Sequence, residues 1–196
     1  MRILALADEE ADKYFEYYQN GVFDDIDIIL AAGDLHREYL EFVVTMSNKP
    51  LYYVRGNHDD SFEVAPPEGC VCIEDDVVTV NGIKIAGLGG AMKYKPGKNM
   101  YTQRQMYFRA FKMLFKIIRR GGIDILLTHA PANELGDLPD LPHQGFKAHR
   151  WLLDMFSPQY MVHGHVHKSY GANIKTRLTY ESTEIVNCCQ YQIIEI

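Results

Sequence analysis

The sequence has little of what directs a chain into a membrane or an oxidising compartment. Apolar runs fall short of the roughly 18 residues that span a bilayer. The N-terminal segment MRILALADEE lacks the long apolar stretch of a secretory signal. The four cysteines include no CxxC pair, which favours buried reduced thiols over a zinc site or a disulfide framework. These absences predict a cytoplasmic protein with no membrane contact.

A surplus of basic residues is also missing. The formal net charge is −6, from 20 Lys and Arg against 26 Asp and Glu, so a surface for long nucleic acid is not expected. What is present is an ordinary globular composition of 47% hydrophobic and 23% charged residues in 196 positions. With no repeat or linker visible, the sequence predicts one domain over residues 1–196. Its oligomeric state is left open.

Apolar runs alternate with segments of helical periodicity. Helices are predicted at 9–20, 36–47, 102–120 and 145–156. Strands are predicted at 3–7, 26–32, 51–54, 70–73, 77–80, 83–88, 123–128, 170–174, 178–180, 185–188 and 191–195, with Met161-Val162 leading into the last motif. The β-α-β-α-β opening implies a parallel sheet with right-handed crossovers, and the whole pattern predicts an α/β fold.

Polar residues stand just past several of these strands. Asp8, Asp34, Asn57 and His129 each follow a predicted buried strand by one to three residues. Because parallel strands bring their carboxyl ends to one edge of a sheet, we expect these side chains to lie together. Asp, Asn and His are ligands of divalent metals, and two adjacent ions can activate water and hold a phosphate. Each residue alone could instead cap a helix or sit in a plain turn.

The motifs occur in a recognisable order. They are Asp8-Glu9-Glu10, Gly33-Asp34, Gly56-Asn57-His58-Asp59, His129 and Gly164-His165-Val166-His167. Over residues 8–167 this pattern resembles the calcineurin-like metallophosphoesterases, in particular small bacterial-type phosphoesterases. The resemblance implies two mixed β-sheets packed as a sandwich and flanked by helices (α/β/β/α). It also implies hydrolysis of a phosphate ester by a hydroxide that two metal ions activate.

The resemblance assigns a role to each motif residue. It implies that Asp34 bridges two divalent ions and that Asp8 and His167 hold the first. The second ion is then held by Asn57, His129 and His165. It implies that His58 contacts the phosphate, where it stabilises developing charge or protonates the leaving oxygen. Asp59 is placed to orient His58.

Glu10 departs from the family pattern, which has His at this position. Glu10 either reaches the first ion as an oxygen ligand or points away as an acid at a helix N-terminus. As a ligand it would make the site harder and less positive. That favours manganese, with iron or magnesium as alternatives and zinc disfavoured, and it tilts the substrate toward phosphodiesters.

Substrate contacts outside the motifs are less defined. Arg104 and His143 are candidates, beside Asn57 and His58, although both also suit plain surface positions. The expected partner is a small phosphorylated substrate, a nucleotide included. The alternative function is a scaffold that keeps the fold and binds a partner protein. Six of the seven metal positions and His58 are kept, which favours catalysis.

Overall fold

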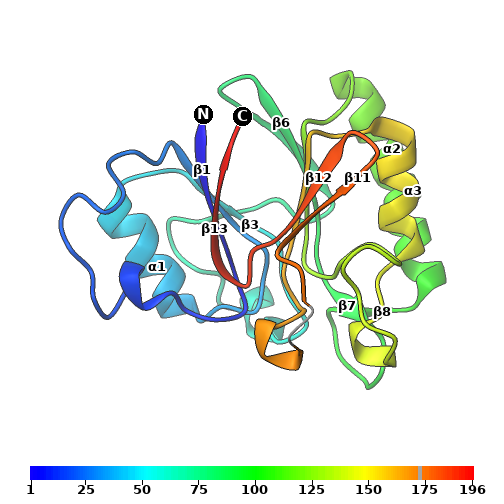
Figure 1. The fold of residues 1–196 in the computed structure, drawn as a ribbon, viewed down its shortest axis with the longest axis horizontal. Helices are drawn as coiled ribbons and strands as arrows, with labels where there is room; N and C mark the ends of the chain where they lie inside the picture. Colours follow the sequence, from blue (N-terminus) through cyan, green and yellow to red (C-terminus); the bar gives the residue numbers. More distant parts are fainter. Residues whose placement is uncertain (172–173) are drawn as a thin grey trace.

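A computed structural model describes residues 1–171 and 174–196. Two β-sheets pack face to face, with helix α1 outside one sheet and helices α2 and α3 outside the other (Figure 1). The predicted α/β/β/α sandwich is confirmed. The strand predicted at 170–174 is wrong in its described residues, because Tyr170 lies in a 3-10 turn and residues 171 and 174 are in no strand; residues 172 and 173 lie outside the described residues. None of the helices in the described ranges has the length and apolarity needed to cross a bilayer.

The first sheet contains the predicted parallel opening. Its strand order is β13-β1-β2-β3-β4, with neighbours parallel except for the antiparallel β13. The strands are β1 (Arg2–Ala7), β2 (Ile28–Ala31), β3 (Leu51–Tyr53), β4 (Val71–Cys72) and β13 (Gln190–Glu195). The carboxyl ends of β1, β2 and β3 therefore share one edge.

The second sheet has the order β11-β12-β10-β9-β6-β5, parallel in its centre and antiparallel at both outer pairs. The strands are β5 (Asp76–Val80), β6 (Ile83–Leu88), β9 (Ile125–Thr128), β10 (Tyr160–His163), β11 (Arg177–Tyr180) and β12 (Thr183–Asn187). A small parallel pair, β7 (Ala91–Met92) and β8 (Met100–Tyr101), lies apart from both.

Alternation along β1 shows why the layers form. Ile3 and Ala5 belong to the core between the two sheets, whereas Leu4 and Leu6 belong to the core beneath α1. All four are fully buried. Successive strand residues face opposite sides, so a strand that is apolar on both faces must be covered on both.

Three predicted helices are confirmed to within two residues: α1 (Arg37–Ser47), α2 (Gln103–Arg120) and α3 (Lys147–Phe156). Helix α2 begins with a capping box between Thr102 and Gln105 and ends at Gly121, whose φ of 72° suits glycine. Its buried face packs on the second sheet.

The helix predicted at 9–20 is wrong. The structure has one short 3-10 turn there, η1 (Asp12–Tyr14). The aromatic spacing reflects packing of an irregular loop: Tyr14 stacks on Phe23, and Phe15 meets Tyr39 edge-on. Aromatic residues have modest helix propensity, so tertiary contacts decided the conformation. The described part of the chain has three other 3-10 turns: η2 (Asp60–Glu63), η3 (Leu141–His143) and η4 (Lys168–Tyr170).

Candidate metal centre

Both sheets contribute polar residues to one edge of the sandwich. Asp8, Asp34 and Asn57 follow β1, β2 and β3 of the first sheet. His129 and His165 follow β9 and β10 of the second. One ligand atom from each of Asp34, His129 and His165 lies within 4.8 Å of the others, although these residues are far apart in the sequence. The predicted convergence of distant motif residues is present.

His129 is oriented by the backbone. Its Nδ1 lies 2.7 Å from the carbonyl oxygen of Ala32, which can accept a hydrogen bond but not donate one. In the neutral ring the proton therefore sits on Nδ1, and the Nε2 lone pair faces Asn57 Oδ1 at 3.1 Å and Asp34 Oδ2 at 3.4 Å. A carbonyl behind the ring and oxygen donors in front are typical of a metal-ligating histidine.

His165 has the same kind of support. Its Nε2 lies 2.8 Å from the carbonyl oxygen of Pro142, which places the proton on Nε2. Nδ1 then carries a lone pair that can bind a metal ion. Its ring centroid is 4.8 Å from that of His129. Asn57, His129 and His165 are all nearly buried, so these donors are held in place by their surroundings.

The loops that present the ligands are in an unusual backbone conformation. Asp8, Asp34 and His165 have φ values of 62°, 57° and 67°, a region that non-glycine residues seldom occupy. Such conformations persist where surrounding contacts hold them, and they concentrate at functional sites. Here the backbone amide of His165 is hydrogen-bonded to the Asp8 carboxylate, which holds both loops in place.

The electrostatics of the site suit cation binding. Burial favours the neutral form of Asp34. The charge of His129 and the hydrogen bonds that Asp34 accepts from His129 and from the His58 amide nevertheless lower the pKa of Asp34 to about 2. Burial also disfavours the charged form of His129, but the charge of Asp34 raises the pKa of His129 to about 9. Burial raises the pKa of Asp8 to about 6. A divalent ion would take the place of the His129 proton, so binding would release a proton.

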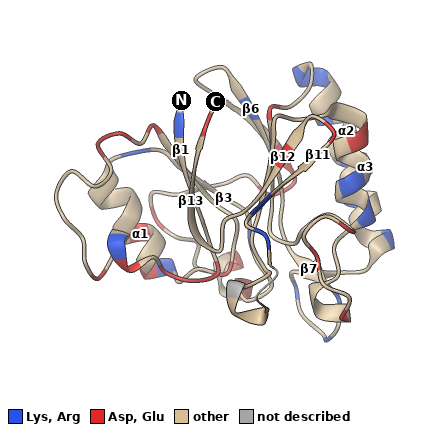
Figure 2. Cartoon of the chain, in the orientation of Figure 1, with Lys and Arg blue, Asp and Glu red and all other residues tan. Residues whose placement is uncertain are grey.

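Acidic residues collect at this edge. Figure 2 shows Asp and Glu in red along the loops below β13 and α1. Asp8, Glu9, Glu10 and Asp34 belong to the loops that follow β1 and β2. Their negative charge is a favourable environment for divalent cations, which in turn would attract a phosphate.

His58 lies exposed at the mouth of the site, while Asp59 is buried. The backbone amide of His58 donates to Asp34 Oδ1 at 2.7 Å. Asp59 Oδ2 accepts hydrogen bonds from the amides of Gly56 (2.7 Å) and Asp34 (2.8 Å), and burial raises the pKa of Asp59 to about 6. Asp59 thus fastens the Asp34 loop to the Gly56 loop. Its predicted orientation of the His58 ring stays a prediction.

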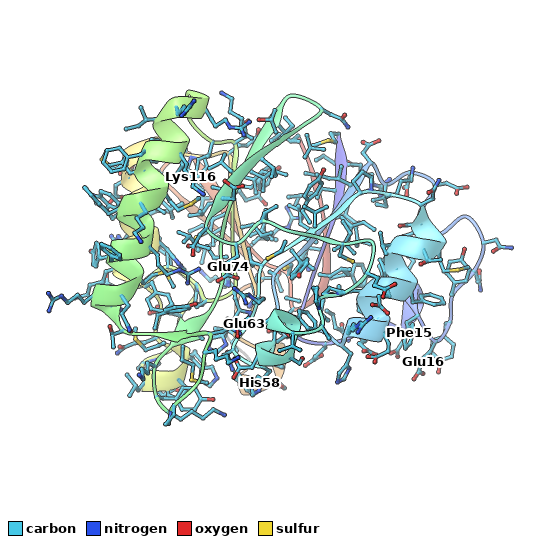
Figure 3. The ribbon with its side chains drawn as sticks, turned by 180° about the vertical axis from the view of Figure 1, so that it is seen from behind. Phe15, Glu16, His58, Glu63, Glu74 and Lys116 are labelled. Carbon is cyan, nitrogen blue, oxygen red and sulfur yellow. The ribbon has the colours of Figure 1, made fainter. Side chains whose placement is uncertain are left out.

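A groove of about 400 Å³ runs beside these residues. Its lining includes Asp34, His36, Arg37, His58 and Phe62. In Figure 3 His58 lies at the lower edge of the molecule, far from Lys116 on α2 near the top. An exposed imidazole at the rim of a groove next to buried metal donors can contact a bound phosphate.

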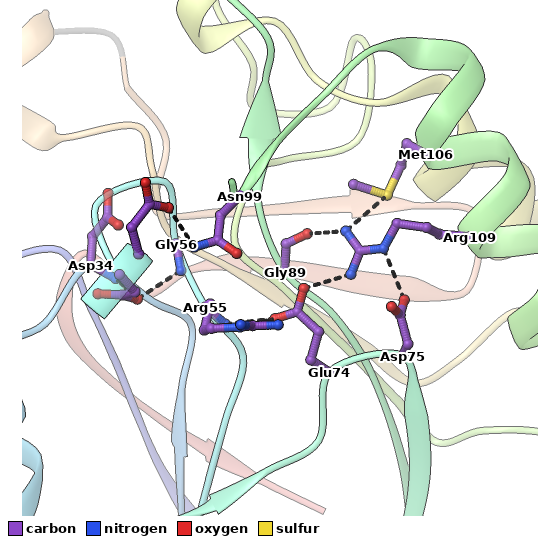
Figure 4. A network of polar contacts seen from close by, with 11 residues as sticks. Asp34, Arg55, Gly56, Glu74, Asp75, Gly89, Asn99, Met106 and Arg109 are labelled. Carbon is purple, nitrogen blue, oxygen red and sulfur yellow. Dashed lines mark hydrogen bonds and ion pairs between the residues drawn. The ribbon is translucent and has the colours of Figure 1, made fainter. Parts of the chain in front are cut away.

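A buried ion network supports the loop that carries Asn57 (Figure 4). Glu74 pairs with Arg55 at 3.3 Å and with Arg109 at 2.6 Å, and Arg109 also donates to the Gly89 carbonyl at 2.8 Å. Gly56, next to Arg55, packs so tightly that an added Cβ would lie 2.1 Å from Asp34 Oδ1. The glycine is needed because the two loops touch.

Glu10 contacts His36 in the structure, which agrees with the interpretation that its side chain points away from the first ion. Glu10 Oε1 lies 2.8 Å from His36 Nδ1, on the solvent side. The neighbouring Glu9 Oε1 lies 3.0 Å from His167 Nδ1, and Cys189 is grouped with this pair. The acidic partner of His167 is therefore Glu9, and the predicted role of His167 as a ligand of the first ion stays a prediction.

The two substrate candidates differ in position. The His143 ring lies 5.2 Å from the His165 ring and 4.7 Å from the Tyr170 ring, so His143 is part of the rim. Arg104 lies in the first turn of α2 and lines another groove with Tyr101 and Phe108. In the described part of the chain, this groove shares no lining residue with the groove of about 400 Å³ beside Asp34 and His58.

Three residues at the site were missed from the sequence: Glu9, Tyr170 and Cys189. Tyr170 belongs to no motif, although its position three residues after His167 hinted at proximity. Cys189 was interpreted as one of several buried thiols. Its position just past β12, parallel to β10, was the available signal.

Carboxylate, amide and imidazole donors at the shared edge of a two-sheet α/β sandwich define a site of the metallophosphoesterase class. The family model for calcineurin-like phosphoesterases matches residues 1–169. The chain belongs to that family.

Comparisons with individual proteins agree on the fold. TT1561 of Thermus thermophilus superposes with a TM-score of 0.67 at 16% identity, covering 96% of this chain and 88% of its own. GAP50, described as the anchor in the inner membrane complex of Plasmodium, gives a TM-score of 0.55 at 11% identity, covering 96% and 71%. The UPF0046 protein T07D4.2 of Caenorhabditis elegans is 28% identical over 122 residues, 61% of this chain. That match spans 28% of the relative's length.

Proposed function

We propose that this chain hydrolyses a phosphate ester with the help of two divalent metal ions. The observation that carries the proposal is the arrangement of Asp34, Asn57 and His129, with His165 beside them. A backbone carbonyl lies behind each of the two imidazole rings, those of His129 and His165. The other nitrogen of each ring therefore has a lone pair that can bind a metal ion. Such an arrangement is costly in a buried site unless a cation satisfies the donors.

Bound divalent cations would supply the chemistry of lowering the pKa of water and neutralising phosphate charge. The protein residues do the rest. Asp34, fixed by the amide of His58, offers carboxylate oxygens between the two sheets. Asn57 and His129 keep their donor atoms 3.1 Å apart. Asp59 joins the loops so that these distances are maintained.

His58 is proposed as the catalytic group that meets the substrate. It is exposed beside Asp34 on the groove, so its ring can reach a phosphate oxygen or the leaving oxygen. There it stabilises developing negative charge or donates a proton. The chain contains no serine or cysteine nucleophile motif that would require a covalent intermediate.

A phosphodiester is the proposed preference, slight over a monoester. The family histidine is absent from this chain, and Glu9 beside His167 contributes a negative charge that lowers the positive charge of the site. A less positive site favours the singly charged diester over the doubly charged monoester. Oxygen and imidazole donors at Asp34, Asn57 and His129 favour manganese there, with iron or magnesium as alternatives.

The proposed substrate is small, and nucleotides are included. The groove of about 400 Å³ fits a small phosphorylated molecule. His143 and Tyr170 form an aromatic rim over the His165 side of the site. The net charge of −6 is unfavourable for long nucleic acid. A cytoplasmic location remains our proposal for the compartment.

The test uses the purified chain, stripped with a chelator and reloaded with Mn²⁺. A chromogenic phosphodiester and a monoester are assayed with wild type, His58→Ala and Asn57→Ala, and with Lys112→Ala on the exposed face of α2 as the control. We expect wild type to turn over both esters, and we expect kcat/KM to fall about 100-fold or more in the first two variants. The control should keep the activity of wild type. No turnover with any metal would favour the alternative, a scaffold that binds a partner protein.

A further inference from the structure

We infer that Glu9, His167 and Cys189 hold one of the two metal ions, with the Cys189 sulfur as a thiolate ligand and with Glu10 outside the metal site. The inference deepens the proposed function and rests on it. The expected donors at this position were Asp8, His167 and, as one interpretation, Glu10. The structure places a different carboxylate there and adds a sulfur.

The geometry is that of a donor cluster. One ligand atom from each of Glu9, His167 and Cys189 lies within 4.8 Å of the others. Ligand atoms bound at about 2.0–2.3 Å from one ion lie at most about 4.6 Å apart, so a small adjustment lets all three reach it. The closest pair, Glu9 Oε1 and His167 Nδ1, is already 3.0 Å apart.

The three residues come from three separate parts of the fold. Glu9 follows β1, His167 follows β10, and Cys189 lies between β12 and β13. Cys189 forms a parallel bridge with Ala7, which places it beside the Asp8-Glu9 turn. This is the same sheet edge that carries Asp34 and His129, so the cluster belongs to the proposed two-ion centre.

The adjacent cysteine shows that Cys189 is not simply another core thiol. Cys188 packs in the apolar core between the sheets. Cys189 is equally buried, yet its sulfur is grouped with a carboxylate and an imidazole. A buried sulfur that faces a carboxylate and an imidazole gains little as plain packing, whereas the three groups together are favourable ligands of a cation.

Glu10 is directed elsewhere. The Glu9 amide bonds to the Ala7 carbonyl at 2.6 Å, which closes a tight turn after β1. Beyond this turn Glu10 pairs with His36 at 2.8 Å. The carboxylate that compensates for the missing family histidine is therefore Glu9.

A thiolate changes the metal preference of this position. Sulfur is a soft donor that selects iron, cobalt or zinc over magnesium, and coordination removes the thiol proton to solvent. The other position, with Asp34, Asn57 and His129, has harder donors. The two positions should therefore differ in affinity and hold a mixed pair, with manganese in the harder one.

The experiment is a Co²⁺ titration of the stripped full-length chain, followed by its absorption spectrum. Wild type should develop the intense near-ultraviolet band of a thiolate bound to cobalt. Cys189→Ser should lose the band and bind one Co²⁺ at least about 10-fold more weakly, whereas Cys188→Ser should keep both. Glu9→Gln should weaken the same event, and Glu10→Gln should not.

A second measurement avoids variants that fail to fold. X-ray absorption of the zinc-loaded wild type should show a sulfur neighbour at about 2.3 Å. A loaded protein without that neighbour or that band overturns this inference and leaves the metal centre standing. Failure of wild type to bind Co²⁺ at all overturns both this inference and the proposed function. A loss caused by Glu10→Gln but not by Glu9→Gln overturns the assignment of the carboxylate.

Discussion

The backbone amide of His165 donates to both carboxylate oxygens of Asp8, at 2.9 Å each, across 157 residues of sequence. Asp8 directly follows a strand of the first sheet, and His165 follows a strand of the second. The bond therefore fixes the relative position of the two sheets at the edge where the metal donors meet. The site depends on the sandwich closing correctly.

Gly164 makes this closure feasible. An added Cβ there would lie 2.5 Å from both Asp8 Oδ2 and the Ala7 Cβ. We expect Gly164→Ala to cost about 1–3 kcal/mol of unfolding free energy and to weaken Mn²⁺ binding about 10–100-fold. Calorimetric titration and urea unfolding measure the two effects.

The matched control is Gly171→Ala. Gly171 is extended, and an added Cβ would meet nothing within 4 Å. Metal affinity in this control should equal that of wild type. An unchanged affinity in Gly164→Ala would mean that the contact with Asp8 does not set the ligand geometry.

The ion network behind the Asn57 loop should matter for stability. Arg109→Met leaves Glu74, whose side chain is 5% exposed, with Arg55 as its remaining charge partner. Because Arg55 still compensates the charge of Glu74, we expect a loss of about 1–3 kcal/mol of unfolding free energy, less than for a buried charge left without any partner. Guanidinium unfolding measures the loss. The exposed Lys112→Met should change stability by less than about 0.5 kcal/mol, and an equally small change in Arg109→Met would refute the role of the network.

His149 predicts a component of acid sensitivity. Burial, helped by the charge of Arg109, lowers the pKa of His149 from 6.5 to about 3. Between these values the unfolded chain binds the proton and the folded chain does not, so this contribution to stability is complete above pH 6.5 and is lost as pH falls toward 3. Between about pH 7 and about pH 4.5, the unfolding free energy of His149→Leu should therefore fall by about 2 kcal/mol less than that of wild type.

Urea unfolding at both pH values tests this difference. His36→Leu, whose histidine side chain is 84% exposed, is the control and should follow wild type. Equal losses in wild type and His149→Leu would show that His149 is not the source.

The aromatic rim should act on substrate binding. His143 lies beside His165 and Tyr170 without belonging to the metal donors. We expect His143→Ala to raise KM about 10-fold with kcat changed less than about 3-fold, because the rim contacts the substrate outside the reacting phosphate. Steady-state kinetics with the better chromogenic ester measure this. A fall in kcat at constant KM would place His143 in the chemical step instead.

Much of the fold could be predicted because its signals are local. The buried runs ending at Asp8, Asp34 and Asn57 are strands whose two apolar faces demand cover on both sides. The helix at 102–120 has both periodicity and end signals. The segment 9–20 misled because its aromatic spacing serves contacts with Phe23 and Tyr39, which lie outside that segment.

Site residues could be predicted where a position just after a strand is enough to bring the side chain to the shared sheet edge, as for Asp34 and His129. They could not be predicted where adjacent residues diverge. Glu9 and Glu10 are chemically identical, and the turn after Ala7 sends one to His167 and the other to His36. Cys188 and Cys189 diverge in the same way. A choice between neighbours requires coordinates.

The most direct test of the two-ion centre is the total metal content of the purified chain after loading with Mn²⁺ and Co²⁺ together and extensive dialysis. Elemental analysis should find close to two ions per wild-type chain and less than one in a folded Asp34→Asn variant, because the family resemblance assigns Asp34 as the bridge between the two ions. Wild type that retains no metal, or Asp34→Asn that retains as much as wild type, would contradict the account.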